Sequence, residues 1–180
     1  MKKLLMELAV LATAATVGGG HLLTPTTAQA KAKTTLKALP KRYRHTWYHY
    51  ANGKLSTLKF SAKAISGRTY YAGEHHAVNY LAHIHAHKLT TTKFRRHFTW
   101  STATTVRAHR SQWLNVRGWN QVMGDGDFYR VMTKTVGGKR VPVLSQAGGA
   151  GVWTAAHYYT SKHVAKQRGT KHFSGEVYYK

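Results

Sequence analysis

Apolar and polar side chains alternate with a period of two residues along much of this chain. The alternation is clearest in residues 55–65, where Leu58 and Phe60 are separated by a lysine and followed by a serine. This is the period of a β-strand with one buried face. Residues 47–50 precede this segment, and Asn52-Gly53 between the two is a strong signal for a tight hairpin turn. The pattern therefore predicts a β-hairpin at the start of the domain.

Later segments are rich in aromatic, Thr and Val residues, which favour strands. The predicted strands are residues 98–106, 113–122, 128–136, 139–144, 152–159 and 173–179. Gly137-Gly138 marks a second tight turn, and the glycines at 148–151 interrupt the pattern. Residues 74–89 fit either a helix or a strand, and the alternate placement of three histidines there favours a strand.

One short helix is expected near the C-terminus. Ser161 is a suitable N-cap for a helix over residues 162–168, and Gly169 is a suitable end. The sequence thus predicts an all-β domain, a single antiparallel barrel or sandwich of about eight strands, with this helix near its end.

The N-terminal region has the features of a secretory signal peptide. Lys2 and Lys3 precede an uncharged apolar run over residues 8–17, and Ala28-Gln29-Ala30 resembles a cleavage site. The run is too short to span a bilayer, although an uncleaved amphipathic anchor is the alternative. We expect a signal peptide over residues 1–30, a basic tether over 31–42 and a β-domain over 43–180, with no transmembrane segment after cleavage.

Charge is the strongest compositional feature. The 28 Lys and Arg residues face only 5 Asp and Glu residues, which gives a net charge of +23 at pH 7. Such an excess says more about partners than about fold. The densest basic positions are Arg95, Arg96, Arg107, Arg110, Lys139, Arg140, Lys162 and Lys166. For an exported protein, the expected partners are anionic cell-wall polymers or acidic glycans, and no motif indicates a specific nucleic acid.

The same composition restricts the possible chemistry. There is no cysteine, which excludes cysteine catalysis and cysteine-ligated metals. Few acidic residues are available for the paired carboxylates of a glycosidase or for the carboxylate that orients a catalytic histidine. The Gly-x-Ser-x-Gly motif that carries the nucleophile of many serine hydrolases does not occur. Asp125 and Asp127 alternate with glycines before a predicted strand, a pattern that indicates a turn, with a weak calcium site as the alternative. We expect no cofactor and no enzymatic activity, with a hydrolase as the least favoured hypothesis.

Two further residue sets are candidates for binding. On a strand, His83, His85 and His87 would share one face, where they would gain charge below pH ~6.5 or hold a metal ion. The alternative is a plain polar face. If the barrel is hollow, its interior could be lined by the five tryptophans, although a filled core is the alternative. These are Trp47, Trp100, Trp113, Trp119 and Trp153.

Three segments carry a resemblance to known proteins: residues 39–48, 113–121 and 145–154. Together with the cleavage site, they resemble the small basic exported proteins of lactic acid bacteria, which implies location rather than mechanism. Thr46-Trp47-Tyr48 before a hairpin is also similar to the opening strand of lipocalin-like barrels, with His45 where that family has Gly.

These observations favour a secreted, non-enzymatic protein that is extracellular or associated with the cell wall and binds anionic polymers by charge. The alternative is a lipocalin-like barrel that carries a small apolar ligand or peptide. The sequence does not indicate an oligomeric state.

Overall fold

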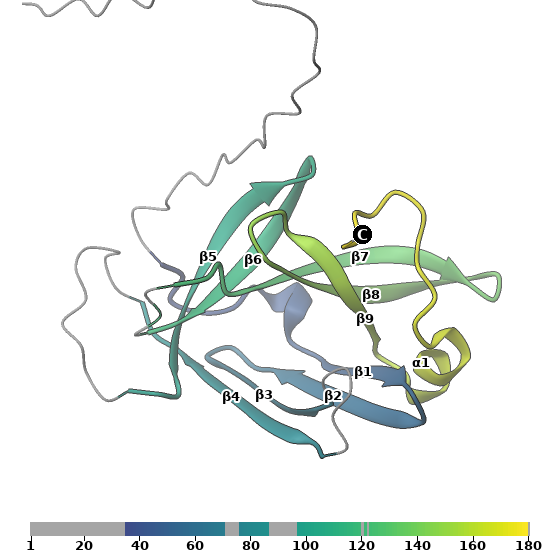
Figure 1. Ribbon diagram of the computed structural model, residues 1–180, viewed down its shortest axis with the longest axis horizontal. Helices are drawn as coiled ribbons and strands as arrows, with labels where there is room; N and C mark the ends of the chain where they lie inside the picture. The colour runs from purple at the N-terminus through teal and green to yellow at the C-terminus, as the bar shows by residue number, and fades with distance from the viewer. Residues whose placement is uncertain (1–34, 71–75, 87–96, 120, 122, 180) are drawn as a thin grey trace, which may run out of the picture.

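The computed structural model describes residues 35–70, 76–86, 97–119, 121 and 123–179, and within them nine strands form one closed barrel (Figure 1). Neighbouring strands are antiparallel except β4 and β5, which pair in parallel. The all-β prediction is therefore confirmed, with nine strands where about eight were expected. Their bounds are β1 Thr46–Ala51, β2 Lys54–Phe60, β3 Ala64–Thr69, β4 Val78–Ile84, β5 Trp100–Ala108, β6 Ser111–Gly118, β7 Asp127–Val136, β8 Lys139–Gly148 and β9 Trp153–Tyr159.

The first hairpin forms as its turn signal predicts. Asn52 and Gly53 adopt positive φ angles of 50° and 76°, which a tight turn between β1 and β2 requires. The predicted second arm is too long, however, because the chain turns back after Phe60. Ser61 Oγ accepts a hydrogen bond from the Ala64 amide at 3.0 Å and stabilises this turn. This turn contains no Gly or Pro. The alternation of apolar and polar residues therefore continues through the turn, and the sequence did not indicate it.

The later elements differ from their predictions mainly at their ends. Strand β8 continues to Gly148, beyond the predicted end at residue 144. Residues 173–179, which were predicted to be a strand, do not form one. They contribute one isolated β-bridge, in which Tyr178 pairs with Thr154. Helix α1 spans Lys162–Arg168, and its N-cap Ser161 accepts from the Val164 amide at 3.4 Å, as predicted.

The described part of the expected tether, residues 35–42, is packed against the barrel. Leu39 is 0% exposed, and its amide donates to the Ala62 carbonyl at 2.8 Å. The short 3₁₀ helix η1, Lys41–Tyr43, then inserts Tyr43 into the core, where its hydroxyl donates to the Tyr129 carbonyl at 3.2 Å. The prediction of a loose tether was wrong for these residues. The segment has few apolar residues among its basic ones, and they do not recur with the period of a strand or a helix, so nothing in the sequence indicated that it packs. Residues 1–34, including the expected signal peptide, lie outside the described residues.

The interior is filled on the side where this segment enters. Leu39, Tyr43, Trp47, Phe60 and Leu114 belong to one buried cluster of the core. Residues on alternate positions of each strand point inward, as the strand period requires. The N-terminal segment thus plugs one end of the barrel and leaves the other end for a cavity.

Helix α1 and the chain after it lie against one side of the outer wall of the barrel (Figure 1). A second apolar cluster joins Ala165 of α1 to Val136, Val143 and Tyr159 of the strands. Of the described residues, no helix has the length and apolar character needed to cross a membrane.

Candidate ligand-binding cavity

The end of the barrel opposite the plug contains a cavity of about 740 Å³. Its wall is formed by β1 to β4 and β7 to β9, together with the β1–β2 turn. Leu58 and several alanines supply apolar surface, and the small alanine side chains leave the interior open. The alanines are Ala51, Ala147, Ala155 and Ala156. A volume of this size is in the range of small-molecule sites.

A cluster of polar side chains lies in the same wall. Tyr158 donates a hydrogen bond from its hydroxyl to Gln146 Oε1 at 3.1 Å. The Tyr80 hydroxyl donates a long hydrogen bond of 3.5 Å to Asp127 Oδ2. The side chains of Gln146 and Tyr129 also hydrogen-bond to this carboxyl group. An apolar cavity with a few convergent polar groups is the usual form of a ligand site.

Asp127 is placed here by the strand pattern. It is the first residue of β7 and pairs with Val116, so it points inward as Tyr129 does two residues later. Gly124 and Gly126, both with φ of 76°, form the turn that was predicted for this segment. Burial raises the pKa of Asp127, and the hydrogen bonds from Gln146 and the two tyrosines offset only part of that rise.

His49 lies on the β1 side of the cavity. Its Nδ1 is 2.9 Å from the carbonyl oxygen of His157, so Nδ1–H donates and Nε2 is the acceptor of the neutral ring. The ring also lies against Tyr158, with centroids 5.2 Å apart. Burial lowers the pKa of His49, the backbone bond partly opposes this, and the charge of His157 adds to the lowering. The imidazole is therefore neutral at pH 7.

The five tryptophans predicted as lining residues do not line this cavity. Trp47 points inward but is fully buried in the plugged half of the core. Trp113 belongs to a separate cluster with Phe128, and Trp153 packs against Tyr179 with ring centroids 5.3 Å apart. Trp100 and Trp119 contact each other with centroids 5.3 Å apart. The prediction was wrong for this cavity because the inward positions on its strands carry smaller or polar side chains.

Trp100 is sandwiched between two histidine rings. His85 and His97 stack on it with centroid distances of 3.7 and 3.9 Å. His83, on β4, is exposed, and His87 lies outside the described residues. Across the parts of the chain that the structure describes, no group of three potential ligands could hold a metal ion. The structure therefore brings His85 to an aromatic stack that the sequence did not indicate.

The predicted basic positions fall into two separate places. Arg107 and Arg110 are exposed at the β5–β6 hairpin, whereas Lys139 and Arg140 are exposed beside the β7–β8 turn. The exposed lysines Lys162 and Lys166 on α1 belong to the latter place, because Val136 and Val141 of that hairpin pack with Ala165 and Val164 of the helix. Arg95 and Arg96 lie outside the described residues.

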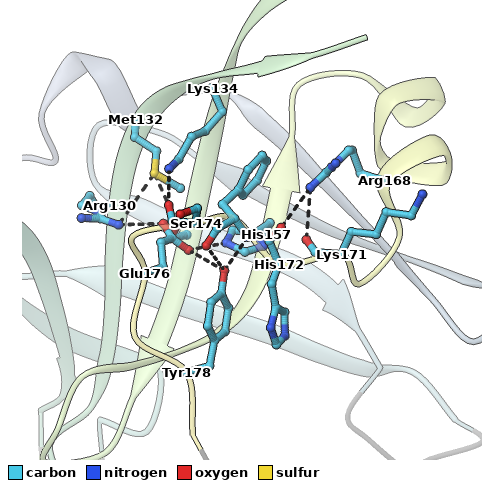
Figure 2. A network of polar contacts seen from close by, with 12 residues as sticks. Arg130, Met132, Lys134, His157, Arg168, Lys171, His172, Ser174, Glu176 and Tyr178 are labelled. Atoms are coloured by element: carbon cyan, nitrogen blue, oxygen red, sulfur yellow. Dashed lines mark hydrogen bonds and ion pairs between the residues drawn. The ribbon is translucent and has the colours of Figure 1, made fainter.

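Glu176 is the centre of a polar network on the outer wall (Figure 2). Arg130 Nη2 and Ser145 Oγ donate to its Oε1 at 2.6 and 2.9 Å. His157 Nε2 lies 2.5 Å from Oε2, and the Tyr178 hydroxyl donates to the same oxygen at 3.2 Å. Its three strand partners stand side by side on β7, β8 and β9. Glu176 thus fastens the C-terminal segment to the barrel.

This network has an arrangement different from that of a hydrolase triad. Ser145 donates to the carboxylate and not to His157, and both residues are buried on the face opposite the cavity. Burial alone would raise the pKa of Glu176, but His157, Ser145 and Arg130 lower it to about 2. The carboxylate is therefore held ionised as a structural anchor.

Comparisons of the chain with protein-family models, with curated proteins and with solved structures give no match. The resemblance to basic exported proteins and to lipocalin-like barrels stays a prediction. The sequence analysis did not predict the polar residues of the cavity as a ligand site, and it interpreted Asp127 as part of a turn. A usable signal was present nonetheless, because polar residues such as Asp127 and Gln146 occupy positions that strand alternation turns inward.

Proposed function

We propose that this protein is a non-enzymatic binding barrel that holds one small, largely apolar ligand in its cavity. The observation that carries the proposal is the cavity of about 740 Å³ at the end opposite the plug. Small-molecule sites are usually concave, mostly apolar pockets of about 300–1,000 Å³ with a few polar groups. This cavity has that size and that combination of side chains.

A fluorescent apolar probe tests the proposal. Neutral N-phenyl-1-naphthylamine should bind the full-length chain with one saturable site and a rise in fluorescence. Replacing Ala156, which lines the cavity, with Phe should weaken that binding at least tenfold, or about 1.4 kcal/mol, because the ring fills the space.

Ala86→Phe is the matched control, because this alanine is exposed after β4 and does not line the cavity. It should leave the affinity unchanged. Absence of saturable binding, or equal binding by the Ala156→Phe variant, would contradict the proposal.

The charge of the chain supports a second candidate function. We propose that the protein is exported and held at the cell wall by anionic polymers. The chain has 5 acidic residues against 28 Lys and Arg, and two of these acids, Asp127 and Glu176, are engaged in the cavity wall and in the C-terminal anchor. Most of the basic charge therefore stays uncompensated by the protein itself. Binding by charge over a surface is independent of what the cavity holds.

Sedimentation with isolated anionic cell walls tests this second function. Salt screens exposed charges within about 10 Å at 0.1 M, so molar salt should release the protein. Changing Lys139, Arg140, Lys162 and Lys166 to Gln should weaken binding more than changing Arg107 and Arg110, since the four lie together beside α1. Binding that ignores salt would rule out the charge-based function.

A further inference from the structure

The carboxyl group of Asp127 restricts the charge of the ligand that the cavity can bind. Its carboxyl group is in the cavity wall, and the groups that hydrogen-bond to it, from Tyr80, Tyr129 and Gln146, are all neutral. The two ion pairs among the described residues both belong to Glu176, on the outer wall. Within the described part of the chain, Asp127 is therefore a carboxylate without an ion-pair partner, although basic residues outnumber acidic ones by 28 to 5 in the sequence.

A carboxylate withdrawn from water is unfavourable unless it is paired. Burial is the largest influence on the pKa of Asp127 and raises it, which reflects that cost. A Lys or Arg at a neighbouring inward position would remove the cost, yet no Lys or Arg of the described segments forms an ion pair with this carboxyl group. A cation supplied by the ligand would remove it in the same way.

The surroundings of Asp127 fit a cationic group on an apolar body. Tyr80, Tyr129 and Tyr158 line the same cavity, and the faces of aromatic rings attract cations. His49 also lines it, but burial lowers its pKa, so it adds no positive charge at pH 7. Lys54 also lines the cavity, but its Nζ lies over the Tyr70 ring, 5.1 Å from the centroid, and its charge is not among the influences on the pKa of Asp127.

We infer that the cavity selects a ligand with a protonated amine, which pairs with the Asp127 carboxylate while an apolar chain or ring fills the space beside Leu58 and the alanines. The inference rests on the proposed binding function and adds the chemical class of the ligand. A neutral ligand that merely fills the cavity would leave the carboxylate unpaired. An anionic ligand would be repelled by it.

Three probes of equal length separate these possibilities: octylamine, 1-octanol and octanoate. Each competes with N-phenyl-1-naphthylamine on the full-length chain at pH 7, where an alkylamine is protonated as a lysine side chain is. Hydrogen bonds to charged groups are stronger than neutral ones, so octylamine should bind roughly tenfold more tightly than 1-octanol. Octanoate should be the weakest competitor.

Asp127→Asn keeps the shape and removes the charge. It should abolish the preference for octylamine over 1-octanol, which is the ratio of the two affinities measured on the same variant. Asp125→Asn, two residues earlier and outside the cavity lining, is the matched control and should keep the preference.

Equal binding of octylamine and 1-octanol by the unaltered protein would overturn the inference without the need for any variant. An amine preference that survives in Asp127→Asn would also overturn it, because the carboxylate would not be its cause. In both cases saturable binding of the fluorescent probe would persist and the proposed function would stand. If neither that probe nor the three octyl compounds bind, both the inference and the proposed function fail.

Discussion

Replacing Glu176 with Gln should detach the C-terminal segment and destabilise the protein. The side chain of Glu176 is 1% exposed, and its carboxylate receives Arg130, Ser145, His157 and Tyr178. The amide of Gln keeps the size but removes the charge that balances Arg130. Because an uncompensated buried charge is costly, removal of one partner of such a pair is strongly destabilising.

The pKa of Glu176 provides the magnitude. Its ordinary value is 4.5, and the folded protein lowers it to about 2. Each pKa unit corresponds to 1.36 kcal/mol, so the ionised form contributes about 3 kcal/mol to the free energy of unfolding at neutral pH. This agrees with the roughly 3–5 kcal/mol that breaking a buried ion pair costs.

The pH dependence follows from the direction of the shift. Since the folded pKa lies below the unfolded value, the stabilisation is complete above pH 4.5 and is lost as the pH falls toward 2. The difference in unfolding free energy between the unaltered protein and Glu176→Gln should therefore be constant between pH 5 and 7 and shrink at lower pH. Asp127, whose pKa is raised, has the opposite effect, but it is common to both proteins.

Urea unfolding followed by tryptophan fluorescence measures this difference, and Asp125→Asn is the control, with an expected change within about 0.5 kcal/mol. The segment could also open while the barrel stays folded, since local openings cost less than global unfolding. Tryptic cleavage at Lys171, which is exposed, would then accelerate in Glu176→Gln. A loss below about 1 kcal/mol with unchanged cleavage would refute the anchoring role.

Two other predictions concern the N-terminal part of the chain. Leu39→Ala should lower the unfolding free energy by about 2–5 kcal/mol, because this plug residue is fully buried, whereas Leu81→Ala, at a side chain that is 46% exposed, should change it little in the same urea assay. If the chain is exported as proposed, mass spectrometry of the culture medium should find a protein that begins at Lys31, and a secreted form that still carries Met1 would contradict a cleaved signal peptide.

The sequence by itself determined the elements whose stability depends on near neighbours. The hairpin at Asn52-Gly53 and helix α1 between Ser161 and Gly169 were both predicted, because a turn conformation and a helix cap involve only residues a few positions apart. Alternation likewise predicted most strands and hence the all-β class. The alternation did not reveal the turn after Phe60, because neither Gly nor Pro interrupts the pattern there.

The tertiary structure alone decided which face of each strand is inside and how full the interior is. Adjacent residues such as Trp113 and Leu114 lie on opposite faces of a strand. Both are large and apolar, so the sequence does not show which of the two points into the barrel. The plug formed by Leu39 and Tyr43 depends on packing against strands far along the chain.

The candidate site is the clearest case of this limit. Tyr80 and Asp127 are 47 residues apart in the sequence, and the closure of the barrel brings them together. Only that closure turns a glycine-flanked acid, which the sequence marks as part of a turn, into a carboxylate in a cavity wall. Local rules determine the strands, but a cavity depends on the long-range register between them, which no single segment contains.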